Sequence, residues 1–181
     1  MRRPRGAAAL DWVTVLLGIA TAVVVATRVL DDRDDTARER ISLPQAPVVL
    51  ISIPGGTSRD VRMGSGAPAV WLFYRETCSV CTAQRPVWRQ LLQRLPRAVE
   101  RHVVSTAPRP DAEPYLGMEG VWESYPADPA ALANALGLTG VPATLFIDAA
   151  GRVDYAEIDL LNAKEADELV SRARRTTRVD R

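Results

Sequence analysis

The sequence has 181 residues, of which 47% are hydrophobic and 25% are charged, and its formal net charge is +1. This length suits one domain with an appended segment rather than two full domains. The near-neutral charge provides no general attraction for nucleic acid, so no nucleic-acid partner is expected. Two cysteines and one histidine are too few for a structural zinc site with four Cys or His ligands, so no metal is expected either.

The first predicted element is an apolar run near the N-terminus. A helix over residues 12–30 would be about 28 Å long, close to the thickness of the hydrocarbon core of a bilayer. Arginines precede the run and four aspartates follow it, so the positive-inside rule places residues 1–9 in the cytoplasm. We therefore predict a single-pass transmembrane anchor at residues 10–30, with the rest of the chain extracytoplasmic or periplasmic in the cell membrane.

Two alternatives compete with the anchor. A cleaved signal peptide needs a small-x-small site after its apolar core, and Ala20-Thr21-Ala22 has the right residues but lies inside the run. A buried helix of a soluble domain would carry an amphipathic stripe, which this run lacks. The anchor is the preferred interpretation.

The rest of the chain is organised as a tether, a domain and a tail. Residues 31–46 are charged and unpatterned, which is typical of a linker. Residues 47–176 carry the periodic apolar patterns of one folded domain, and residues 177–181 form a short tail. Within the domain, strand and helix patterns alternate before a final hairpin and helix. In chain order the patterns predict a hairpin over 48–63, a doubly buried strand over 69–74, a helix over 80–95, strands over 99–106 and 121–125, a helix over 129–136, a hairpin over 144–158 and a helix over 163–175.

The chemistry concentrates where the buried strand meets the next helix, at Cys78-Ser79-Val80-Cys81. A helix N-terminus has unpaired N–H groups and a positive dipole end, which stabilise a thiolate at Cys78. The two-residue spacer lets a disulfide close and reopen with little backbone movement. Cys78 is therefore expected to attack a substrate disulfide, and Cys81 to resolve the mixed disulfide.

Other roles of a Cys-x-x-Cys pair are disfavoured to different degrees. Haem attachment requires a following His, and Thr82 stands there. Zinc binding requires a second pair of ligands. A structural disulfide remains open in an oxidising compartment, although so short a loop would stabilise the fold little.

A second signal is Gly140-Val141-Pro142, at the start of an apolar strand. A cis Val141–Pro142 bond would bend the chain sharply and leave the neighbouring backbone free to pair with an incoming peptide. A trans proline that merely begins the strand is the alternative.

Together these segments resemble the thioredoxin superfamily, and more narrowly its membrane-anchored TlpA/ResA-like extracytoplasmic branch, over residues 47–175. The Thr-Cys-Ser-Val-Cys core is also similar to methylamine dehydrogenase maturation proteins. The resemblance implies a thioredoxin-like α/β fold, with a central mixed sheet flanked by helices, on one N-terminal transmembrane helix. It also implies Cys78 as nucleophile, Cys81 as resolving thiol, Pro142 as a cis-proline facing them, and Pro86 as the proline that kinks the helix.

The resemblance further implies a thiol–disulfide oxidoreductase that acts on exported proteins, with reduction favoured over oxidation, in the maturation of cytochromes c or of other metalloproteins or cofactor enzymes. It implies no cofactor besides the redox-active Cys78–Cys81 disulfide, and a transmembrane thiol electron donor as partner. Thr77, Val141 and Pro142 are the expected substrate contacts. The alternative is a non-catalytic thioredoxin-fold module that docks a client protein near the cis-proline loop.

The sequence departs from the family pattern at two positions near the cysteine pair. Thr77 stands where family members usually have Trp, and Leu72 stands where thioredoxins carry a buried Asp. Glu76 is the only acid close to the pair in sequence, and we consider both proton transfer and a solvated loop carboxylate as its role. His102 is expected to be structural.

Overall fold

The computed structural model describes residues 16–21, 41–64, 66–107 and 113–179, and it divides the chain into the units Met1–Thr36 and Ala37–Arg181. Residues 16–21 are helical in the first unit. Within the described ranges no helix is long and apolar enough to cross a membrane. Most of the anchor predicted at residues 10–30 and of the linker predicted at residues 31–46 lies outside the described residues, so both stay predictions.

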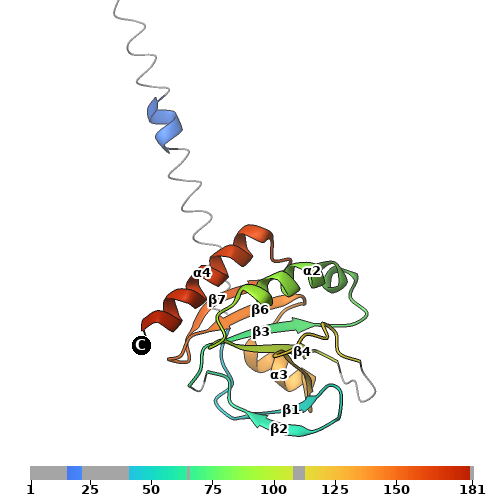
Figure 1. Ribbon diagram of the computed structural model, residues 1–181. Coiled ribbons are helices and arrows are strands. Elements are labelled where there is room, and N and C mark those ends of the chain that lie inside the picture. The colour runs from blue at the N-terminus through green and yellow to red at the C-terminus, as the bar shows by residue number, and fades with distance from the viewer. Residues whose placement is uncertain (1–15, 22–40, 65, 108–112, 180–181) are drawn as a thin grey trace, which may run out of the picture. The chain divides into compact units, whose positions relative to one another are not determined.

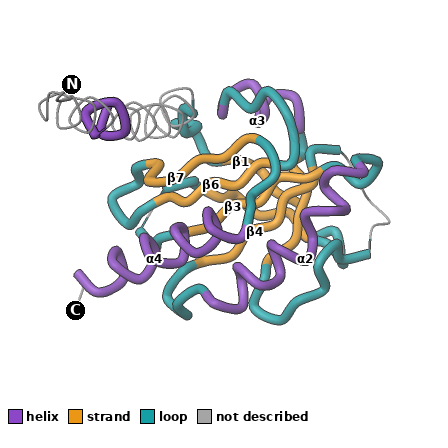
Figure 2. The backbone as a smooth tube through the Cα atoms, turned by 90° about the horizontal axis from the view of Figure 1, so that it is seen from above, coloured by secondary structure: helices purple, strands orange, loops and turns teal. Residues whose placement is uncertain are grey.

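The second unit is built on a seven-stranded sheet in the order β2-β1-β5-β4-β3-β6-β7. Helices α2 and α4 cover one face of this sheet and α3 covers the other (Figures 1 and 2). The elements are β1 (Val48–Ser52), β2 (Ser58–Val61), β3 (Ala69–Tyr74), α2 (Ser79–Arg94), β4 (Glu100–Ser105), β5 (Trp122–Pro126), α3 (Pro129–Leu136), β6 (Ala143–Ile147), β7 (Val153–Ile158) and α4 (Ala163–Val179).

The sheet is mixed, as predicted. β4 pairs in parallel with β3 and β5, and the other neighbouring strands pair antiparallel. Every residue of β3 is buried, because helices cover both faces of this central strand. The continuous apolar run of residues 69–74 predicted this burial. β3 therefore provides a rigid base for the segment that follows Tyr74.

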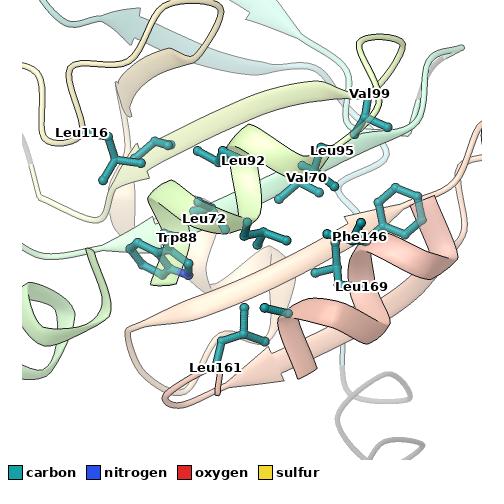
Figure 3. Packing of buried hydrophobic residues seen from close by; sticks show 14 of the residues in the cluster. Val70, Leu72, Trp88, Leu92, Leu95, Val99, Leu116, Phe146, Leu161 and Leu169 are labelled. Atoms are coloured by element: carbon teal, nitrogen blue, oxygen red, sulfur yellow. The ribbon is translucent and has the colours of Figure 1, made fainter. Parts of the chain in front are cut away.

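Two apolar clusters fill the space on either side of the sheet. The cluster between α2, α4 and the sheet includes Trp88, Leu72, Phe146 and Leu169 (Figure 3). The cluster on the α3 side includes Trp71, Phe73, Leu132, Leu136 and Leu145. Each large side chain buried in this way contributes about 1.5–3 kcal/mol. Because α2 is held by the first cluster, its N-terminus is fixed at the end of β3.

Three helix ends differ slightly from the sequence prediction. α2 begins at Ser79, with Cys78 as its N-cap, and ends at Arg94, so both of its ends lie one residue earlier than expected. α4 continues to Val179 rather than ending at 175. The hydroxyl groups of Thr176 and Thr177 donate to backbone carbonyls one turn earlier, so these two polar residues fit within the helix. By contrast, α3 has the predicted bounds, since Asp128 caps its start and Gly137 ends it at φ 68°.

Candidate active site

Cys78 lies at the N-terminal cap of α2, where the chain turns after β3. The N–H of Cys78 donates to the carbonyl of Arg75 at 3.1 Å and closes this turn. The Cys78 sulfur accepts the N–H of Cys81 at 3.1 Å. A sulfur in this position replaces the oxygen of a usual N-cap residue and lies at the positive end of the helix dipole. The structure therefore places this sulfur where the sequence predicted it.

The two thiols differ in burial and in acidity. Burial opposes ionisation of Cys78, but hydrogen bonds from Cys81, a backbone hydrogen bond from Val80 and the charge of Arg75 outweigh it, so the pKa of Cys78 is lowered. Cys81 is fully buried, and burial together with its hydrogen bond to Cys78 raises its pKa to about 11. Cys78 therefore ionises first, at a half-buried position.

The two cysteines are close enough to form a disulfide with each other. They lie within 2.7 Å of each other, and both are free. Leu72, which stands where the resemblance to thioredoxins would put a buried Asp, belongs to the same buried apolar cluster as Cys81. Within the described parts of the chain, no group of His, Cys, Asp or Glu residues could hold a metal ion.

The loop before β6 faces the cysteines. β3 and β6 pair antiparallel, with Phe73 opposite Ala143, so the end of β3 and the start of β6 lie at the same edge of the sheet. The Val141–Pro142 bond is cis, which confirms the prediction and excludes the trans alternative. The Cys78 thiol contacts the carbonyl of Val141 at 3.8 Å.

A groove of about 420 Å³ opens between Cys78 and this loop. Thr77 and Val141, two of the predicted substrate contacts, line it together with Arg75. Glu76 is exposed and is not among the residues that line the groove. The groove thus brings together the first cysteine, the residue before it and the loop, but Glu76 does not line it.

His102 has a structural role, as expected. It lies buried on β4, and its ring stacks on Trp71 at 4.0 Å between centroids. Its Nε2 pairs with a carboxylate oxygen of Glu100 at 3.1 Å. Trp71 belongs to the apolar cluster on the α3 side, whereas Cys81 belongs to the α2 side, so the sheet separates this histidine from the buried cysteine.

Tyr115 is a residue of the site that sequence analysis missed. Its hydroxyl donates to the carbonyl of Cys81 at 2.6 Å. Its ring stacks on the ring of Tyr74, with the two centroids 3.9 Å apart. The guanidinium of Arg85, a residue of α2, lies 4.3 Å from the centroid of the Tyr115 ring. Tyr115 thereby fixes the first turn of α2 against the end of β3.

Glu123, in β5, holds the Tyr115 segment in place. Its side chain is buried, and its carboxyl oxygens accept the N–H groups of Tyr115, of Leu116 at 2.9 Å and of Gly117 at 2.7 Å. Residues 107–129 have no periodic pattern, so the sequence did not indicate these contacts. The one available signal was an acid inside a short strand of otherwise uncharged residues.

Two further side chains fasten α2 behind the site. The indole N–H of Trp88 donates to the hydroxyl of Thr144 at 3.0 Å, which joins α2 to the strand after the cis-proline. The Gln84 amide donates to the carbonyl of Leu161 at 3.0 Å and accepts its N–H at 3.1 Å. Pro86 lies within α2 at the position that the family resemblance assigned to it. The cysteine turn and the loop are therefore held in a fixed relation.

Comparison with known structures identifies this architecture. No protein-family model matches the chain, and no curated protein matches it. A thio-disulfide isomerase from Thermus thermophilus is 22% identical with a TM-score of 0.53, covering 74% of this chain and 94% of that one. DsbF from MTB is 21% identical with a TM-score of 0.58, covering 75% and 99%. The thioredoxin domain of a thiol-disulfide oxidoreductase from Bacteroides vulgatus is 16% identical with a TM-score of 0.57, covering 73% and 97%.

These similarities establish the class of fold. The second unit of the chain has a thioredoxin-like α/β fold, with a mixed central sheet and flanking helices. Two of these solved proteins are named as a thio-disulfide isomerase and as a thiol-disulfide oxidoreductase, and DsbF is described in oxidised and reduced forms.

Proposed function

We propose that this chain is a thiol–disulfide oxidoreductase in which Cys78 is the nucleophile and Cys81 the resolving thiol. The observation that carries the proposal is the difference in burial and acidity between the two cysteines. A half-buried thiol of lowered pKa caps a helix, and a fully buried thiol with a pKa of about 11 lies one turn deeper. Both features match the division of labour that thiol–disulfide exchange requires. Two structural neighbours, a thio-disulfide isomerase and a thiol-disulfide oxidoreductase, have names that agree with this chemistry.

In the reducing direction, the Cys78 thiolate attacks one sulfur of a client disulfide and releases the other client sulfur as a thiolate. Cys81 then loses its proton, to that thiolate or to water, and attacks the Cys78 sulfur. The Cys78–Cys81 disulfide forms, the mixed disulfide breaks, and the client leaves as a dithiol with two electrons gained. An external dithiol then reduces the pair again. The groove formed by Thr77, Val141 and their neighbours would hold the client during the exchange.

We further propose that the reaction takes place outside the cytoplasm on exported proteins, such as apocytochromes c or cofactor enzymes in maturation. The support is the charge pattern around residues 10–30, basic before the apolar run and acidic after it. A reductase in that compartment needs electrons from a transmembrane thiol donor.

The location is tested with a reporter enzyme fused after Arg181. We expect activity from a reporter that works only outside the cytoplasm, and none from a reporter that works only inside it. Recovery of the fusion in the membrane fraction would support the anchor at residues 10–30. Cytoplasmic reporter activity, or release of a soluble processed form, would contradict it.

The redox function is tested by equilibrating the chain with glutathione buffers and measuring the reduction potential of the cysteine pair. Because reduction is the proposed direction, we expect a reducing potential of about −200 to −270 mV rather than the roughly −120 mV of a strong oxidant. A value near that of the oxidant would assign oxidation instead, and failure of the pair to form a disulfide in any buffer would contradict the redox proposal.

A further inference from the structure

The groove beside Cys78 carries one charged side chain, that of Arg75. Among the described residues that line the groove, the others are uncharged apart from the thiol itself. Arg75 follows the last residue of β3 and lies three positions before the nucleophile. The turn is closed by the hydrogen bond between the Cys78 N–H and the Arg75 carbonyl, so the backbone fixes where the arginine side chain begins.

The guanidinium of Arg75 is available to a ligand. Its side chain is exposed, and none of the ion pairs between described residues involves it. It is near enough to the sulfur for its charge to lower the pKa of Cys78. A client disulfide that reaches Cys78 must therefore approach within the range of this positive charge.

The loop before β6 contributes Thr139, Gly140 and Val141 to the lining of the same groove. A Cβ placed on Gly140 would have no atom within 4 Å, so the space beside this part of the loop is open. An extended segment of a client can lie between the loop and the cysteine turn. With its disulfide sulfur at Cys78, the residue next to its cysteine would be close to Arg75.

We propose that this groove selects client disulfides that have an acidic residue adjacent to the cysteine, with the client carboxylate bound by the guanidinium of Arg75. This inference rests on the proposed function. A guanidinium binds a carboxylate through two parallel hydrogen bonds, which fixes the orientation of the bound segment as well as adding attraction. The carboxylate takes no part in the electron transfer, and the thiol–disulfide exchange is unchanged.

The test uses two disulfide-bonded peptides that differ only in Asp or Asn next to one cysteine. Their rates of reduction by the reduced full-length chain are measured at low ionic strength. We expect the Asp peptide to react about three- to tenfold faster, because an ion pair that is partly exposed to solvent adds binding free energy of that order. The preference should shrink in 0.5 M salt, where screening acts over roughly 4 Å.

Substitution of Arg75 isolates the contact. In Arg75→Gln the ratio of the two rates should fall to about one, and Arg75→Lys should keep part of the preference, since it retains the charge but not the two-pronged geometry. The ratio is the readout because the loss of Arg75 also changes the acidity of Cys78, which affects both peptides alike. Arg97→Gln removes the same charge from an exposed turn before β4, at the opposite edge of the sheet, and should leave the ratio unchanged.

Equal rates for the two peptides with the wild-type chain, or a preference that survives in Arg75→Gln, would overturn the selectivity while leaving the proposed function intact. Reduction of neither peptide by the wild-type chain would overturn the proposed function and the selectivity together.

Discussion

A Cys81→Ser variant is expected to accumulate as a covalent conjugate with its client, while its turnover falls by at least about 10³-fold. In this variant the Cys78 thiolate still attacks, because its helix cap and the charge of Arg75 remain. The serine hydroxyl that replaces Cys81 cannot attack the mixed disulfide, so the intermediate persists. The conjugate is measured on a non-reducing gel, should disappear with dithiothreitol, and identifies the client by mass.

The matched control is Cys78→Ser, which keeps the other thiol. That thiol is fully buried and has a pKa of about 11, so it should trap far less client. A non-catalytic docking module predicts a different result, in which both serine variants retain the client non-covalently and neither forms a conjugate. That outcome would replace catalysis with docking at the cis-proline loop. More trapping by Cys78→Ser than by Cys81→Ser would reverse the assigned roles.

Replacement of Glu123 by Ala should lower the free energy of unfolding by about 3 kcal/mol or more. The substitution leaves the N–H groups of Tyr115, Leu116 and Gly117 without their acceptor, and buried unpaired polar groups cost about 1–3 kcal/mol each. Glu123→Gln keeps one carbonyl oxygen that can accept these hydrogen bonds, so it should lower the free energy of unfolding by less. Urea denaturation measures both changes.

The control for Glu123 is Glu119→Ala, which removes the same type of side chain from an exposed position in the same segment. Exposed substitutions of this kind change stability by about 0.5 kcal/mol or less. A loss below about 1 kcal/mol in Glu123→Ala would show that the carboxyl group does not hold the Tyr115 segment. We also expect a slower reaction of Cys78 in Glu123→Ala, because the Tyr115 hydroxyl would no longer fix the Cys81 carbonyl.

Several parts of this fold follow from short stretches of sequence. The apolar run of residues 69–74 predicted a doubly buried strand, and the helix predicted over 129–136, with Gly137 closing it, has the same bounds in the structure. The cysteine pair after that strand predicted a thiol at a helix N-terminus, and the structure has Cys78 as the N-cap. Each of these features depends on neighbouring residues, through backbone propensity, capping or burial periodicity, so the local sequence is sufficient to indicate it. The cis bond before Pro142 is different, because the local residues left a trans bond open and only the resemblance to thioredoxins implied the cis form that the structure has.

The surroundings of the cysteines were decided by tertiary structure alone. Tyr115 is 34 positions from Cys81 along the chain, and Val141 is 63 from Cys78. No local pattern distinguished Arg75, which the fold brings into the lining of the same groove as Val141. Contacts of this kind arise when strands far apart in sequence pair at one edge of the sheet, and no periodicity within a single segment encodes them. The sequence by itself therefore determined which two thiols are candidates for disulfide exchange, whereas the packing of distant segments decided which residues hold those thiols and which charged side chain lies beside them.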